Sequence, residues 1–113
     1  MQDAVIFDVD GTLCNVKSIR HLVTGKKPDF DAFHKASASC PPHNHVVRAA
    51  QKVKDRGDAV LIVTARMTTY RNITAFWLAM NHVPSDALYM RAEGDFRKDY
   101  VVKKEILEKI RSQ

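Results

Sequence analysis

Two aspartates, Asp8 and Asp10, stand two residues apart at the end of the apolar stretch 4–9. Alternate side chains of an extended chain point to the same side, so both carboxylates are expected to face one place. Two neighbouring carboxylates repel each other unless they share a proton or bind a cation such as Mg²⁺, which prefers oxygen ligands. An Asp-x-Asp pair also occurs as a simple loop cap, so this pair alone indicates a candidate site and not yet a reaction.

A hydroxyl and a guanidinium follow the next apolar stretch, residues 59–63, in the form of Thr64 and Arg66. A hydroxyl can hydrogen-bond a phosphoryl oxygen, and an arginine can add a charge-assisted contact to the same group. Threonine after a strand is common, so the pair is weak evidence by itself. A third group of polar residues, from Arg91 to Asp99, follows the apolar stretch 87–90.

Two adjacent lysines, Lys103 and Lys104, lie near the start of a helix predicted over residues 99–111, and either could be the lysine that faces the candidate site. At about 100° per residue, Lys103 falls on the side of this helix that carries its apolar residues, and Lys104 falls on the polar side. A charge on an apolar face is costly unless it is paired. Asp99, four residues earlier, is expected to cap the helix and to hold Lys103. Lys103 would then be placed to neutralise the charge of Asp8.

The elements that must position these groups follow from the hydrophobic pattern. Continuous apolar runs predict buried strands over residues 4–9, covered on both faces, and 59–63, and a short third strand over residues 87–90. Their alternation with helices predicts one α/β domain over residues 1–113, a three-layer parallel sheet with flanking helices. In such a sheet the ligand binds beyond the carboxyl ends of the strands, where all the polar groups named above are expected.

Apolar residues at helical spacing predict the helices between these strands. One helix carries Val46, Ala49, Ala50 and Val53 and ends at Gly57; the other carries a stripe that we expect to be core, formed by Ile73, Phe76, Trp77 and Met80. The polar stretch 14–45 contains glycine and proline breakers and a short helix over residues 31–36.

Composition narrows the class of protein. The 113 residues are 45% hydrophobic and 27% charged, with a net charge of +5, which excludes disordered and fibrous classes. The longest apolar run is Ala75–Met80, too short for a membrane span, and no secretory leader is visible. Two cysteines make no disulfide framework, so a reduced cytoplasmic protein is expected. The basic excess suits a phosphorylated or polyanionic ligand, or simply a solvated surface.

The segment Phe7–Leu13, Phe-Asp-Val-Asp-Gly-Thr-Leu, resembles the first motif of the haloacid dehalogenase (HAD) superfamily of phosphatases. This resemblance implies that Asp8 is the nucleophile that becomes an aspartyl-phosphate, and that Asp10 is the acid and base. It also implies a Rossmann-like fold, Mg²⁺ held by Asp8 and Asp10, and Thr64 as a phosphate ligand. Lys103 would complete the catalytic set.

The segment that leads to Lys103 is similar to the 3′-phosphatase domain of phage polynucleotide kinase-phosphatases. The matching positions are Arg91, Gly94, Asp95, Arg97, Asp99 and Lys103. This similarity implies hydrolysis of a 3′-phosphate at a nucleic-acid end, as in nucleic-acid repair. It also implies that Arg66, Arg91, Arg97 and Asp99 contribute to substrate binding, and that residues 14–45 form a small cap. The superfamily's fourth motif, an acidic pair on a further strand, is not found among the 113 residues.

Three alternatives stay open at this point. A chain truncated at its C-terminal side could borrow a metal ligand by self-association through the exposed edge of its sheet. It could be a phosphatase of small nucleotides or metabolites, because the 14–45 segment would set substrate choice. Without the fourth motif it could also be a non-catalytic module that binds phosphate or nucleic-acid ends.

Overall fold

The computed structural model describes residues 3–113 and contains a parallel three-stranded sheet. The strands are β1 (Ala4–Phe7), β2 (Ala59–Met67) and β3 (Ala87–Arg91), in the order β1-β2-β3. β1 pairs with β2 from Ala4↔Ala59 to Phe7↔Ile62, and β3 pairs with the other side of β2. The parallel α/β architecture predicted from the alternation of apolar runs is confirmed.

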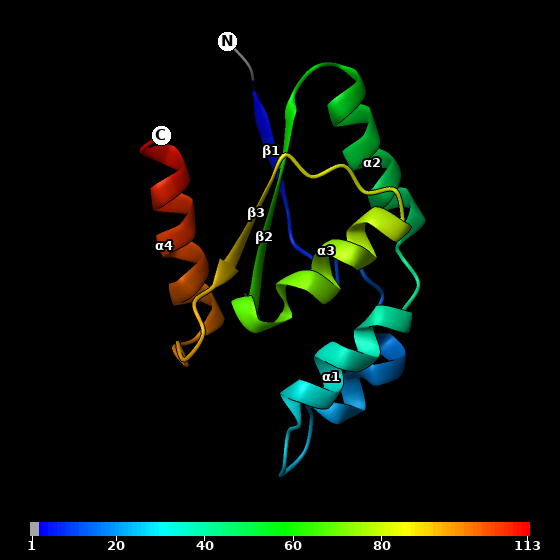
Figure 1. The fold of residues 1–113 in the computed structure, drawn as a ribbon, viewed down its shortest axis with the longest axis vertical. Helices are drawn as coiled ribbons and strands as arrows, with labels where there is room; N and C mark the ends of the chain where they lie inside the picture. The colour runs from blue at the N-terminus through cyan, green and yellow to red at the C-terminus, as the bar shows by residue number, and fades with distance from the viewer. Residues whose placement is uncertain (1–2) are drawn as a thin grey trace.

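Three longer helices flank the sheet: α2 (Asn44–Asp55), α3 (Arg71–Met80) and α4 (Asp99–Arg111). In Figure 1 the sheet is seen nearly edge-on, with α4 on one side and α2 and α3 on the other. This arrangement gives the three expected layers. Each of α2 and α3 connects two neighbouring parallel strands, so each forms a βαβ unit. None of these helices, within the residues described, is long and apolar enough to cross a membrane.

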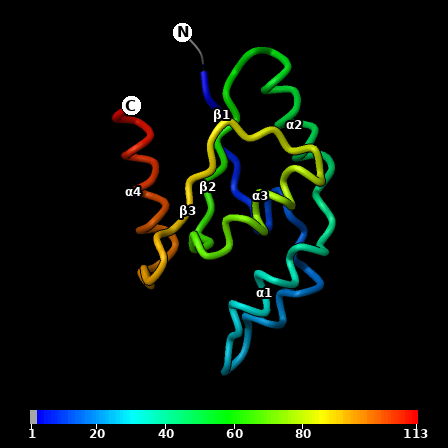
Figure 2. Tube along the Cα trace, viewed as in Figure 1, coloured from blue at the N-terminus to red at the C-terminus, as the bar shows by residue number. Residues whose placement is uncertain are grey.

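The 14–45 segment is more helical than its polar composition suggests. It contains two 3₁₀ turns, η1 (Lys17–Leu22) and η2 (Ser37–Ser39), and the short helix α1 (Phe30–Ala36). The Asp29 carboxylate accepts the Ala32 N–H and caps α1. The Cα trace in Figure 2 shows this segment projecting from the end of the molecule toward which the strands run.

β1 is an edge strand, and the prediction that it is buried on both faces is wrong. Within the described chain it pairs with β2 alone, and its residues alternate between exposed and half-buried. Ile6 is 41% exposed. An apolar strand with one unpaired side is a surface on which another strand can pair. Self-association through this edge stays a prediction.

β2 is longer than the predicted strand and continues to Met67. Thr64 and Arg66 therefore lie in the C-terminal part of β2 and not beyond its end. The pairing of β2 with β3 is irregular in this stretch, between Val63 and Met67. A break of register of this kind re-aims side chains at the end of a strand. Both side chains are buried, with 1% exposure for Thr64 and 2% for Arg66.

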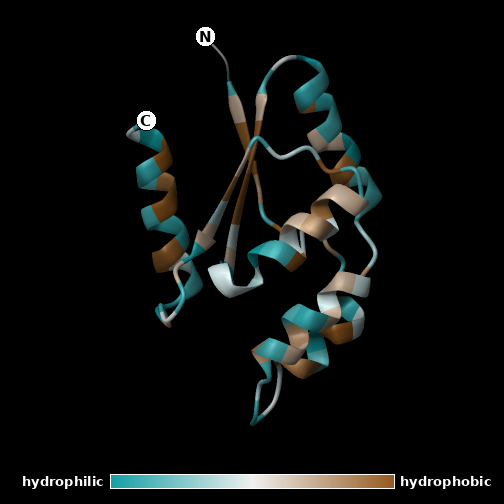
Figure 3. Ribbon diagram, in the orientation of Figure 1, coloured by the Kyte–Doolittle hydropathy of each residue, from teal (hydrophilic) through white to brown (hydrophobic). Residues whose placement is uncertain are grey.

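The predicted apolar stripe of α3 is only partly core. Trp77 is buried, Ile73 is half-buried, but Phe76 and Met80 are 64% and 62% exposed. The buried face is instead formed by Thr74, Trp77 and Leu78. On α2 the buried face also differs from the predicted one, since Val47 is buried and Ala49 is exposed. Figure 3 shows the apolar colour gathered on the strands and on the sides of helices that face them.

The contrast between Trp77 and Phe76 gives a direct test of this helix face. Trp77 also donates from Nε1 to the Cys40 carbonyl at 2.9 Å, which ties α3 to the 14–45 segment. We expect Trp77→Ala to lower the free energy of unfolding by about 3–5 kcal/mol, because it leaves a cavity and an unpaired carbonyl. Phe76→Ala is expected to change it by about 0.5 kcal/mol or less. Urea denaturation followed by circular dichroism measures both. Equal losses in the two variants would contradict the assignment of the buried face.

Candidate functional site

The turn that follows β1 carries both aspartates. Gly11, at φ 81°, allows a tight turn in which the Cys14 N–H donates to the Val9 carbonyl at 2.8 Å. Val9, Leu13 and Cys14 are at most 1% exposed and anchor this turn in the core. Asp8 and Asp10, on either side of buried Val9, stay partly exposed. The chain therefore presents two carboxylates from a rigidly packed turn.

Asp8 is held from two directions. Its Oδ1 accepts its neighbour's N–H, from Val9, at 2.8 Å, and its Oδ2 accepts Lys103 Nζ at 3.0 Å. The two side chains are 33% and 32% exposed, so this ion pair is open to solvent on one side. Lys103 reaches Asp8 from the first turns of α4, across 95 positions of sequence. A carboxylate oriented by a cation, yet accessible, is suited to attack an electrophile.

Asp10 is bound by the buried guanidinium of Arg66. Arg66 Nε donates to Oδ2 at 3.0 Å and Nη2 donates to Oδ1 at 2.5 Å, a bidentate contact. The remaining Nη1 donates to Thr74 Oγ1 at 3.0 Å. Arg66 thus has its side-chain donors directed to Asp10 and α3. Arg66 therefore holds Asp10 in one orientation, and the expectation that Arg66 binds substrate stays a prediction.

Thr64 lies behind the same turn. Its Oγ1 accepts the Arg66 backbone N–H at 3.2 Å, and its side chain is buried. The hydroxyl hydrogen has no acceptor among the hydrogen bonds of the described residues. The sequence-based expectation that Thr64 binds a phosphoryl oxygen stays a prediction.

Arg91 organises the loop between β3 and α4. Its Nη1 donates to the carbonyls of Asp95, at 2.9 Å, and of Arg97, at 2.7 Å, and its Nη2 pairs with the Asp99 carboxylate. Its side chain is 8% exposed, against 72% for Asp99. Asp99 therefore pairs with Arg91 and not with Lys103. The predicted helix cap is also wrong, because the N-cap residue of α4 is Lys98 and no side chain caps it.

Arg97 forms the outer side of this loop. It donates to both oxygens of Asp95 and of Glu105, which joins the loop to the second turn of α4. The Arg97 guanidinium holds the pKa of Asp95 at about 2 and lowers that of Glu105, and these carboxylates raise the pKa of Arg97. Arg97 is exposed and lies on the outside of the loop. The Arg97 guanidinium therefore binds Asp95 and Glu105, and the expectation that it contributes to substrate binding stays a prediction.

Two residues that the sequence pattern did not single out lie beside this group. Thr74 is fully buried and accepts Arg66; its position on the buried helix face, one turn before Trp77, was the available signal. His34, on α1, packs its ring against Tyr70 at 4.6 Å between centroids, and its Nδ1 is buried without a hydrogen-bond partner in the described chain. Tyr70 also donates to Asp31 at 2.8 Å. The 14–45 segment is therefore fastened next to the carboxyl end of β2.

His34 makes the free energy of unfolding of the chain depend on pH. Burial and the Arg66 charge lower the pKa of His34 from its ordinary value of 6.5, against the opposite effect of Asp10, Asp31 and Asp99. The unfolded chain then binds this proton more tightly than the folded chain. We expect the free energy of unfolding to fall as the pH drops below about 6.5, and this part of the loss to disappear in His34→Asn. Urea denaturation at a series of pH values measures it, and an identical pH profile in both chains would contradict the burial of this ring.

Neither a cluster of metal-ligating side chains nor a reactive cysteine adds to the candidate site within the described residues. In the part of the chain that the structure describes, no group of three or more His, Cys, Asp or Glu side chains could hold a metal ion. Burial, with Asp10 as a further cause, raises the pKa of Cys14 to about 12, so Cys14 is a thiol at neutral pH and a poor nucleophile.

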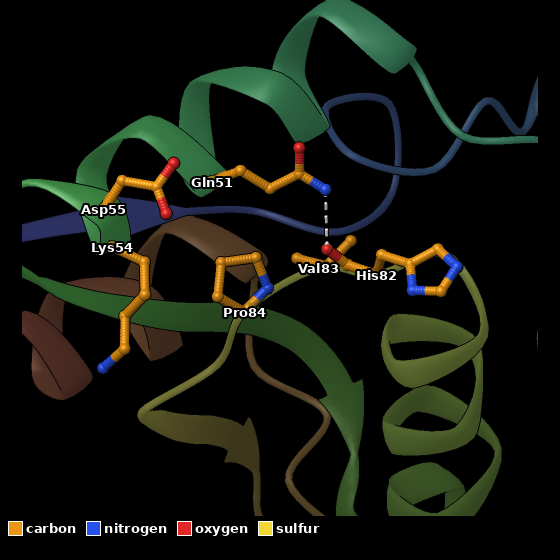
Figure 4. Close-up of a pocket in the computed structure, with 6 residues that line it drawn as sticks. All are labelled: Gln51, Lys54, Asp55, His82, Val83 and Pro84. Carbon is orange, nitrogen blue, oxygen red and sulfur yellow. Dashed lines mark hydrogen bonds between the residues drawn. The ribbon is translucent and has the colours of Figure 1, made fainter.

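A surface hollow lies between α2 and the loop before β3 (Figure 4). It is lined by Gln51, Lys54, Asp55, His82, Val83 and Pro84, and Gln51 Nε2 donates to the His82 carbonyl at 3.0 Å. These residues belong to the end of α2 and the loop before β3. Asp8 and Lys103 lie at the carboxyl ends of the strands, so this hollow is separate from the candidate site.

Comparison with known proteins gives a consistent family. Residues 2–113 match the family described as polynucleotide kinase PNKP phosphatase domain. Two solved structures of a Pnkp1/Rnl/Hen1 complex, one titled as an RNA repair complex, contain chains 30% and 28% identical to this one, with TM-scores of 0.78 and 0.80. Each match covers 96% of this chain but 34% and 32% of the other, so the chain spans about a third of their length.

A third structure, from Vibrio cholerae, shares the fold alone. It is 22% identical with a TM-score of 0.53, over 98% of this chain and 95% of that one. Among curated protein sequences none matches this chain.

Proposed function

Because the chain belongs to the polynucleotide kinase PNKP phosphatase domain family, we propose that it hydrolyses 3′-phosphomonoesters at nucleic-acid ends through Asp8. The observation that carries the proposal is the accessible Asp8 carboxylate, with Lys103 Nζ 3.0 Å from Oδ2 and the fixed Asp10 two residues away. Residues 14–45 act as a small cap over this group.

In the first step an Asp8 oxygen attacks phosphorus, and the bond between phosphorus and the 3′-oxygen of the substrate breaks. Asp10, in its protonated form, gives its proton to that oxygen as it leaves. The Lys103 ammonium offsets the negative charge of Asp8 and of the phosphoryl oxygens. Thr64 contributes its free hydroxyl hydrogen to a phosphoryl oxygen.

In the second step water attacks the phosphorus of the Asp8 aspartyl-phosphate. Asp10, now a carboxylate, takes a proton from this water, and the bond between phosphorus and Asp8 breaks to release inorganic phosphate. Arg66 keeps Asp10 in one orientation through both steps by its bidentate contact. Asp99 and Arg97 act on substrate indirectly in this scheme, by fixing the β3–α4 loop together with Arg91.

The donor set is compatible with Mg²⁺. Asp8 offers a carboxylate oxygen on its solvent-exposed side, and Asp10, whose two oxygens each accept from Arg66, would bind the ion through a remaining lone pair. Mg²⁺ sites commonly use one or two carboxylates, with water and substrate phosphate as the other ligands. Bound there, Mg²⁺ would neutralise phosphoryl charge. We expect phosphate release to stop when a chelator such as EDTA is added and to return with excess Mg²⁺. Full activity in the chelator would contradict this part of the proposal.

A polynucleotide end is favoured over a small ester by two observations. The chain carries a net charge of +5, and both similar Pnkp1 structures are complexes, one of them titled for RNA repair. A basic domain attracts a polyanion more strongly than a single phosphate group.

The test is phosphate release, in Mg²⁺, from three substrates at equal concentration: a 3′-phosphorylated oligonucleotide, the same oligonucleotide with a 5′-phosphate, and a nucleoside 3′-monophosphate. We expect the 3′-phosphorylated oligonucleotide to have the highest kcat/KM. Equal turnover of the mononucleotide would favour a small-nucleotide phosphatase. No turnover by a folded chain would leave a module that binds phosphorylated ends.

A further inference from the structure

Two exposed aromatic rings, Phe96 and Tyr100, lie in the segment that follows β3, at the carboxyl end of the sheet. Phe96 is 84% exposed, more than any other large apolar side chain in the described residues, and Tyr100 is 69% exposed. Phe96 belongs to the β3–α4 loop, and Tyr100 to the first turn of α4. Leaving large rings in water forgoes the stabilisation that their burial would give, so two of them in one short segment indicate a contact with something outside the chain.

The loop that carries Phe96 is fastened on both sides of this residue. Arg91 Nη1 binds the carbonyls of Asp95 and Arg97, the two chain neighbours of Phe96. Arg97 in turn binds Glu105 on α4. A ring presented by a loop that is already ordered loses little conformational freedom when it meets a ligand.

Tyr100 is placed next to the reacting groups by helix geometry. Residues three apart on a helix are neighbours on its surface, about 60° apart around the axis, so Tyr100 lies one turn before Lys103 on the same side of α4. Lys103 Nζ is 3.0 Å from Asp8 Oδ2. A phosphoryl group bound at Asp8 would therefore have the rest of its nucleotide within reach of this aromatic ring.

The surrounding charge favours a nucleic-acid ligand. Lys98 and Lys104 lie on either side of Tyr100 in the sequence, and neither forms an ion pair within the residues that the structure describes. Aromatic rings that stack on bases, combined with cations that follow the phosphates, are the usual means of binding single-stranded nucleic acid. We propose that Phe96 and Tyr100 form a stacking platform for the bases nearest the 3′-phosphate. This rests on the proposed function in taking a phosphorylated 3′-end as the ligand.

The exposed apolar pair on α3 does not share this setting. Phe76 and Met80 on α3 are 64% and 62% exposed, four residues apart, but residues 72–81 contain no Lys or Arg. They therefore provide a matched control of similar exposure and size.

The kinetic test compares the double variant F96A Y100A with F76A M80A. The substrates are a 3′-phosphorylated oligonucleotide and an abasic oligomer with the same phosphorylated backbone. We expect F96A Y100A to raise KM for the oligonucleotide by at least the roughly fivefold to hundredfold typical of one removed stack, and to leave KM for the abasic oligomer unchanged. F76A M80A should change neither, and F96Y Y100F should restore binding. An equal rise for both substrates, or no rise, would overturn the platform.

A binding measurement separates the platform from the phosphatase activity itself. In Phe96→Trp, the new indole should be quenched by the 3′-phosphorylated oligonucleotide and not by the abasic oligomer, while Trp77, 3% exposed, gives a constant background. Absence of turnover would count against the proposed function alone. Absence of base-dependent quenching would overturn the platform whether or not phosphate is released.

Discussion

Replacing Asp8 by Asn should reduce phosphate release from a 3′-phosphorylated oligonucleotide by about four orders of magnitude or more, as expected when a covalent nucleophile is removed. An amide is nearly the same size as the carboxylate but is a far weaker nucleophile. The side chain is 33% exposed and its ion pair with Lys103 is partly solvated, so we expect the free energy of unfolding to change by about 1 kcal/mol or less. Initial rates and urea denaturation of the two chains measure the two effects.

Asp86 offers a matched control for this substitution. Its side chain is also 33% exposed and also pairs with a lysine, Lys54, at 2.5 Å. It lies before β3, at the opposite end of the sheet from Asp8, and also accepts the Val60 N–H. Asp86→Asn should keep the wild-type rate. Comparable losses of activity in Asp8→Asn and Asp86→Asn would show that charge removal anywhere on the sheet impairs the protein, against a special role of Asp8.

Replacing Arg66 by Lys should damage both activity and stability. A lysine ammonium does not reproduce the bidentate contact with Asp10 together with the bond to Thr74. We expect kcat to fall by about a hundredfold because Asp10 is misplaced, and the free energy of unfolding to fall by about 2–3 kcal/mol because buried polar groups lose their partners. Rapid kinetics and urea denaturation give the two numbers.

The exposed Arg71 is the control for Arg66. Its guanidinium makes only long contacts, of 3.5 Å, to the Leu88 carbonyl. Arg71→Lys should leave kcat unchanged and the free energy of unfolding within about 0.5 kcal/mol. If Arg66 acts through Asp10, then Asp10→Asn and Arg66→Lys will be strongly non-additive in a double-mutant cycle. Additive effects on kcat would contradict an action of Arg66 through Asp10.

The fold was largely predictable because each strand begins with a continuous apolar run. Ala87–Arg91 and the helix Asp99–Arg111 lie where the hydrophobic pattern places them, give or take one residue. The parallel order of strands follows from the helices between them. Exposure was less predictable, since β1 is an edge strand and half of the α3 stripe faces solvent. Helical spacing defines a face, but it does not say how far the sheet beneath extends to cover it.

The candidate site was predictable in its location more than in its contacts. Helix geometry separated Lys103 from Lys104 correctly, since Lys103 contacts Asp8 and Lys104 is exposed. It also suggested Asp99 as the partner of Lys103, whereas Asp99 pairs with Arg91. Local spacing cannot weigh a neighbour four residues away against a carboxylate 95 positions distant. The same limit hid the Arg66–Asp10 pair, which joins residues 56 positions apart.

The central claim, that Asp8 carries the phosphoryl group, is tested most directly by rapid acid quenching and peptide mass spectrometry. The wild-type chain is mixed with a 3′-phosphorylated oligonucleotide and Mg²⁺, quenched within the first turnover and digested. We predict that the peptide containing Asp8 gains the mass of one phosphoryl group, and that the Asp8→Asn chain gains none. Phosphate release with the phosphoryl group on another residue would contradict the account.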